Sequence, residues 1–90
     1  MPIRLLIVDD HAVVRQGLQM FLKLDPELEI LGEAVNGQQA IELVTQLKPD
    51  IVLMDLLMPV MGGVEAIGII RRDFPDVEVI ALTSVLEDKA

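Results

Sequence analysis

The acidic residues Asp9, Asp10 and Asp55 are the side chains whose positions in the sequence best suit chemistry. Asp9 and Asp10 close an apolar run over residues 3–8, and Asp55 closes a second apolar run that begins at residue 51. Ligands bind at the carboxyl ends of the strands in open α/β sheets, so a carboxylate there is a candidate functional group. A single aspartate at a strand end more often bonds the loop backbone. A functional interpretation therefore requires that several acids converge.

The composition favours one folded domain that binds cations. The 90 residues are 52% hydrophobic and 24% charged, which is typical of a globular chain and allows a modest core. A net charge of −8 disfavours direct binding of nucleic acid or of anionic membranes. The absence of cysteine excludes disulfides and thiol catalysis and agrees with a cytoplasmic location. No apolar run reaches membrane-spanning length, and no signal peptide is recognisable.

Strands and helices are predicted to alternate along the chain. Strands are expected over residues 3–8, 29–34, 51–55 and 77–82, with helices over 11–24, from Asn36 to Lys48, and from beyond Gly63 to Pro75. Asn36 and the glutamine three residues later have the spacing of a capping box. A further helix is expected to open at Ser84. The apolar stripe of the first helix is predicted to comprise Val14, Leu18, Phe21 and Leu22.

This alternation predicts an α/β fold with a parallel sheet and helices on both faces. The acid-rich strand 29–34 is expected at an edge. In the flavodoxin-like strand order 2-1-3-4-5, Asp9, Asp10, Asp55 and Thr83 would line one crevice, since neighbouring strands lie about 4.8 Å apart. Crowded carboxylates are normally either protonated or bound to a hard cation. Mg²⁺, with Asp10 and Asp55 as direct ligands, fits this arrangement best.

Three motifs in this order resemble the response-regulator receiver domain of two-component signalling. They are Leu-Leu-Ile-Val-Asp-Asp-His at 5–11, Leu-Met-Asp-Leu-Leu-Met-Pro-Val-Met-Gly-Gly at 53–63 and Ala-Leu-Thr-Ser at 81–84. The Asp-His corner and the Met-Pro-Val-Met-Gly-Gly-Val loop further resemble the LuxR-type subclass, whose receivers precede a helix-turn-helix DNA-binding domain. The resemblance covers the whole chain.

The resemblance implies a role for each matching residue. Asp55 would accept a phosphoryl group from a histidine kinase. Asp10, Asp55 and the Leu57 carbonyl would bind Mg²⁺, with Asp9 acting through a metal-bound water. Thr83, with Ser84 beside it, would form the switch that moves onto the phosphoryl group. A receiver takes part in its own phosphorylation and dephosphorylation but is not a conventional turnover enzyme.

The sequence departs from the receiver pattern at its C-terminal end. The resemblance leads us to expect a fifth strand carrying a lysine, and a last helix, and residues 1–90 contain neither. Lys89 is expected in the helix after Thr83 and so would not replace that lysine. We therefore expect an incomplete receiver domain whose fourth strand is an unprotected edge, guarded only by Glu78. Homodimers or domain-swapped assemblies are the expected result.

Other interpretations are less favoured. A haloacid-dehalogenase-like phosphatase would need a second acid at the position of Leu57, and a flavodoxin-like cofactor module would need glycines and hydroxyls after the first strand. His11 could be a metal ligand or phosphate relay, but a solvated histidine at the start of a surface helix is the expected reading. Arg71 and Arg72 complement a helix C-terminus and receive no functional role.

Overall fold

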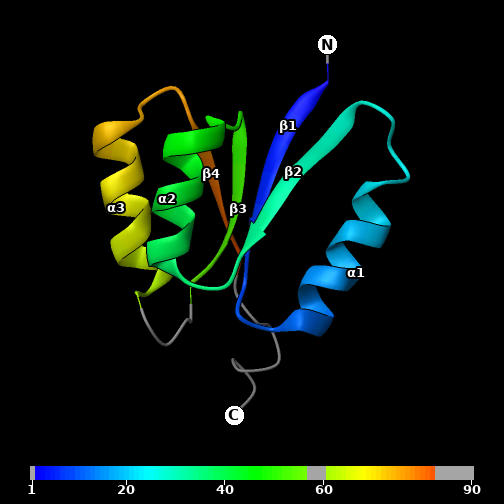
Figure 1. Ribbon diagram of the computed structural model, residues 1–90, viewed down its shortest axis with the longest axis horizontal. Helices are drawn as coiled ribbons and strands as arrows, with labels where there is room; N and C mark the ends of the chain where they lie inside the picture. Colours follow the sequence, from blue (N-terminus) through cyan, green and yellow to red (C-terminus); the bar gives the residue numbers. More distant parts are fainter. Residues whose placement is uncertain (1, 57–60, 83–90) are drawn as a thin grey trace.

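The computed structural model describes residues 2–56 and 61–82, and it has the predicted alternation of strands and helices. The four strands form one parallel sheet in the order β2-β1-β3-β4 (Figure 1). This order confirms the flavodoxin-like arrangement and the edge position of β2. In chain order the elements are β1 (Ile3–Val8), α1 (Ala12–Leu22), β2 (Leu28–Ala34), α2 (Gly37–Leu47), β3 (Ile51–Asp55), α3 (Gly63–Asp73) and β4 (Glu78–Leu82).

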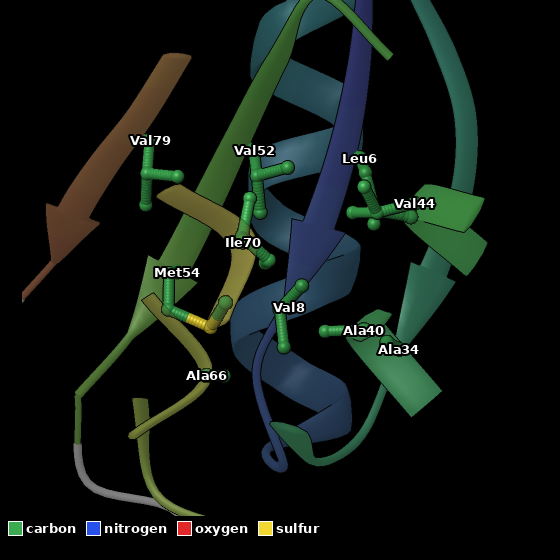
Figure 2. Packing of buried hydrophobic residues seen from close by; sticks show 10 residues of the cluster. All are labelled: Leu6, Val8, Ala34, Ala40, Val44, Val52, Met54, Ala66, Ile70 and Val79. Carbon is green, nitrogen blue, oxygen red and sulfur yellow. The ribbon is translucent and has the colours of Figure 1, made fainter. Parts of the chain in front are cut away.

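The hydrophobic core lies between the sheet and the helices α2 and α3, which cover the same face (Figure 1). Alternate residues of each strand point into this layer, because successive side chains of a strand face opposite sides of the sheet. Small residues on the helices allow close approach to the branched residues of the strands (Figure 2). The buried cluster comprises Leu6, Val8, Ala34, Ala40, Val44, Val52, Met54, Ala66, Ile70 and Val79.

Helix α1 lies on the opposite face, where it contacts β2 (Figure 1). The predicted apolar stripe of this helix is not buried: Phe21 is 71% exposed, and no residue of α1 is buried. The helix itself is where the spacing predicted it, but helical periodicity indicates an apolar face and not how much of that face a neighbour covers. Among the described residues, no second helix packs beside α1 as α3 packs beside α2.

Because the apolar stripe of α1 is not buried, polar contacts are the main described link between this helix and the sheet. The Arg15 Nε donates a hydrogen bond to Glu33 Oε1 on β2 at 2.7 Å, and the Gln19 side-chain amide donates to the other oxygen of Glu33. The Arg15 Nη1 also donates to the Asp9 carbonyl at 2.7 Å. The Arg15 side chain is largely covered, so this charge-assisted network is less screened than a surface ion pair.

Both ends of α2 are fixed by local hydrogen bonds. Asn36 Oδ1 accepts from the Gln39 backbone N–H at 2.8 Å, which confirms the predicted N-cap, while Gln39 Oε1 accepts from the Val35 N–H. At the other end Lys48 adopts a left-handed conformation with φ of 48°. The Arg4 guanidinium donates to the Leu47 and Lys48 carbonyls and so satisfies helix-end acceptors. None of the described helices is long and apolar enough to cross a membrane.

Candidate functional site

The three predicted acids converge at the carboxyl edge of the sheet. Strands β1 and β3 are neighbours, with Val8 paired to Met54, so the residues that follow each strand emerge side by side. Potential metal-ligating atoms of Asp9, Asp10, His11 and Asp55 all lie within 4.8 Å of one another. The predicted convergence of the acids is therefore confirmed. We call these four residues the acidic pocket.

The carboxylates of the acidic pocket differ in burial. Asp9 and Asp55 are 5% and 8% exposed, whereas Asp10 is half-buried. Asp55 is the last residue of β3 and pairs with Leu82 of β4, which fixes its backbone against that strand. Two buried carboxylates and a third beside them make a concentration of negative charge that favours a bound cation.

His11 contacts two of the acids, which the sequence did not indicate. Its imidazole Nδ1 lies 2.9 Å from Asp9 Oδ1 and 3.1 Å from Asp10 Oδ1. The His11 backbone N–H also donates to Asp9 Oδ1, at 2.8 Å. The hydrogen bond that His11 makes to the Asp9 carboxylate, and then the charge of Asp10, raise the pKa of His11. The imidazole is 63% exposed, so it is solvated as expected, but it is also paired with the acids.

Asp10 supplies an oxygen that suits a metal ion. Its Oδ1 is inaccessible to solvent and has no hydrogen-bond partner among the described residues, although it lies within ion-pair distance of His11. Asp9 Oδ1 takes both hydrogen bonds from His11. A buried carboxylate oxygen without a donor is costly, and a hard cation would satisfy it. The residues present therefore fit Mg²⁺.

Two glycines allow close contacts at the starts of α2 and α3. A Cβ on Gly63 would lie 2.2 Å from the Asp55 carbonyl oxygen, so only glycine allows α3 to begin this close to β3. The Gly37 N–H donates to the Met61 carbonyl at 3.0 Å, which joins the start of α2 to the loop after β3. Sequence reasoning had treated Gly63 as a loop residue and had not identified either contact.

Arg15 is a further residue near the pocket that sequence reasoning missed. Its hydrogen bond to the Asp9 carbonyl fixes the corner between β1 and α1, and its ion pair with Glu33 ties that corner to β2. A basic residue one helical turn after His11 was the available signal. Nothing in the sequence indicated that its partner would be Glu33, 18 positions further on.

Several predicted residues are not part of the described site. Leu57, Thr83, Ser84 and Lys89 lie outside the described residues. Arg71 and Arg72 occupy the last turn of α3, as expected. Arg72 pairs there with the adjacent Asp73.

Comparison with known proteins identifies the family. The model of the response regulator receiver domain matches residues 5–90. The response regulator protein VraR of Staphylococcus saprophyticus is 47% identical over 88 residues, which are 98% of this chain and 42% of that protein. The chain thus spans less than half the length of this relative.

Solved structures agree with this match. The response regulator domain of Thermotoga maritima CheB superposes with a TM-score of 0.89 at 36% identity, covering 100% of this chain and 66% of that one. A LuxR-family two-component response regulator from Aurantimonas gives a TM-score of 0.87 at 34% identity, covering 92% and 59%. The chain belongs to the response regulator receiver domain family.

Proposed function

We propose that this chain is the phosphoryl-accepting domain of a two-component response regulator and that Asp55 is the residue phosphorylated. The observation that carries the proposal is the convergence of three carboxylates, two of them buried, at the carboxyl edge of a receiver-type sheet. Asp55 is the central acid because it ends the strand between β1 and β4.

The chemistry proposed for Asp55 is nucleophilic attack on phosphorus. Its carboxylate oxygen forms a bond to the phosphorus atom while the bond from phosphorus to the donor nitrogen of a kinase histidine breaks, which leaves an acyl phosphate on Asp55. Phosphoryl transfer depends on in-line positioning and on neutralisation of the oxygen charges. Burial of Asp55 and its fixed backbone supply the positioning.

Mg²⁺ is the proposed cofactor, and when bound it would neutralise phosphoryl oxygen charge. Asp10 and Asp55 would hold it directly, together with the Leu57 carbonyl. Asp9 would act through a water molecule, which is consistent with the use of its Oδ1 by His11. The solvent-inaccessible Oδ1 of Asp10, which accepts no hydrogen bond from the described residues, supports a direct contact from that residue.

The proposed output is transcriptional control by a DNA-binding domain outside these 90 residues. Similarity to a LuxR-family response regulator supports this output class. Phosphorylation at Asp55 would pull Thr83, and Ser84 beside it, toward the site and so alter a surface element. A sensor histidine kinase is the proposed partner, and cytoplasmic location and self-association stay predictions. The domain is proposed to take part in its own phosphorylation without acting as a turnover enzyme.

Mass mapping tests the acceptor directly. Incubation with phosphoramidate or acetyl phosphate and Mg²⁺ should place a phosphoryl group on Asp55 and nowhere else. Asp50→Asn is the matched control. Asp50 immediately precedes the first residue of β3, at the end of the strand away from Asp55, and an asparagine there can still accept the hydrogen bond from the Arg4 backbone N–H. The control should be phosphorylated like the wild type. A label that survives Asp55→Ala would contradict the assignment.

Metal titration tests the cofactor. Calorimetry or NMR should detect one Mg²⁺ site in the wild type and in Asp50→Asn, and markedly weaker binding in Asp55→Asn and Asp10→Asn, because each loses a charged oxygen ligand. Equal Mg²⁺ affinity in all four proteins would refute the site.

A further inference from the structure

The imidazole of His11 gives the acidic pocket a ligand of a different chemical kind from its carboxylates. We propose that His11 is a nitrogen ligand in this pocket, so that the pocket also binds divalent ions that favour imidazole, such as Zn²⁺, Ni²⁺ and Cu²⁺. The inference rests on the proposed cation site and extends it from an oxygen-only site to a mixed one.

The distances already suit shared coordination. His11 Nδ1 lies 2.9 Å from Asp9 Oδ1 and 3.1 Å from Asp10 Oδ1. Ligand atoms bound to one Zn²⁺ at about 2.0–2.2 Å are separated from each other by roughly 3–4 Å. Because the ligand atoms of the pocket lie within 4.8 Å of one another, side-chain shifts of less than about 1 Å would bring them onto one ion.

The chemistry of the ligands separates two classes of ion. Carboxylate, carbonyl and water ligands suit Mg²⁺, which keeps several waters and gains little from a nitrogen donor. Imidazole suits Zn²⁺, Ni²⁺ and Cu²⁺, whose affinity for mixed nitrogen and oxygen sites is much higher. Removal of the His11 ring should therefore weaken binding of the second class of ion much more than it changes Mg²⁺ binding.

Nδ1 of His11 carries a hydrogen in the metal-free protein and loses it when a metal ion binds. An ionised carboxylate only accepts hydrogen bonds, so Nδ1 carries the hydrogen that points to Asp9 when no metal is bound. On metal binding the Nδ1 hydrogen leaves to solvent, the ion binds the lone pair that this frees, and Nε2 carries the ring hydrogen. The exposed ring gives solvent access for this exchange. Metal ligation through Nδ1 with Nε2–H facing water is thus the expected bound state.

NMR of the imidazole nitrogens tests the inference without any activity measurement. His11 is the only histidine in the 90 residues, so a ¹⁵N-labelled, tag-free chain gives one pair of imidazole signals. Adding Zn²⁺ should move the Nδ1 signal to the range of a metal-bound nitrogen while Nε2 keeps its hydrogen. An unchanged Nδ1 signal at saturating Zn²⁺ would overturn the inference.

Calorimetry with matched variants supplies the second readout. His11→Gln should lower Ni²⁺ affinity by about tenfold or more relative to any change in Mg²⁺ affinity. Gln16→Ala, an exposed change on the same helix, should alter neither affinity. Equal effects of His11→Gln on both ions, or no effect on Ni²⁺, would overturn the inference.

A variant of Asp10 distinguishes binding of the ion by the whole acidic pocket from binding by His11 alone. In Asp10→Asn, the Nδ1 shift should require about tenfold more Zn²⁺, because the pocket has lost a charged ligand. A shift at unchanged Zn²⁺ concentration would mean that His11 binds the ion outside the pocket and would overturn the inference. Failure of the wild type to bind Mg²⁺ would instead overturn the proposed cofactor site, while the Nδ1 signal would still decide the role of His11.

Discussion

Replacement of Gly63 by alanine should damage the junction between β3 and α3. The added Cβ would lie 2.2 Å from the Asp55 carbonyl oxygen, 2.6 Å from the Leu56 Cα and 3.0 Å from the Asp55 carbonyl carbon. All three are backbone atoms, so no side-chain rotation can relieve the clash. The start of α3 must move away from β3 by about 1 Å, and close-packed interiors resist such shifts.

The expected loss of stability is roughly 1–3 kcal/mol, the usual range for overpacking. The better helix propensity of alanine offsets about 0.5–1 kcal/mol at most. For a domain of this size each kcal/mol corresponds to about 4–8 °C in the unfolding midpoint. Thermal or urea unfolding would measure the loss, and Mg²⁺ affinity should fall in parallel because Asp55 is displaced.

Gly68→Ala is the matched control, because it makes the same change in the same helix. A Cβ on Gly68 meets nothing within 4 Å, so this variant should gain about 0.5–1 kcal/mol from helix propensity alone. Opposite signs for the two substitutions are therefore predicted. A Gly63→Ala protein with an unfolding midpoint at or above that of the wild type would refute the packing argument.

Three further predictions concern the core, a helix end and the acidic pocket. Ile70→Ala, at a fully buried position of α3, should cost about 2–5 kcal/mol in urea unfolding, and a loss below 1 kcal/mol would contradict its place in the core. Lys48→Gly should raise stability by up to about 1 kcal/mol, because glycine adopts the left-handed conformation at the end of α2 without steric cost; a lower unfolding midpoint would count against this. The raised pKa of His11 means that its protonated form stabilises the fold, so in metal-free buffer the stability advantage of wild type over His11→Gln should be full below about pH 6.5 and lost as the pH rises through the folded-state pKa. An advantage independent of pH, measured by thermal unfolding between about pH 5 and 9, would show that the ion pair contributes nothing.

The amino-acid sequence by itself determined the order of strands and helices and the meeting of the acids. Short apolar runs closed by aspartates define strands with carboxylates at their ends, and parallel strands bring those ends to one edge. The cap at Asn36 was also predictable, since it depends on residues three positions apart. Each of these features follows from local spacing together with the restricted topology of α/β sheets.

Only the tertiary structure decided how elements distant in sequence meet. The exposure of Phe21 depends on what covers α1, and the contact of Arg15 with Glu33 depends on how α1 lies across β2. The need for glycine at position 63 comes from the closeness of α3 to the end of β3. The pairing of His11 with two acids depends on the turn after β1. Periodicity specifies which face of an element is apolar, but burial, ion pairs and close approaches depend on the relative placement of whole elements, which the sequence pattern does not encode locally.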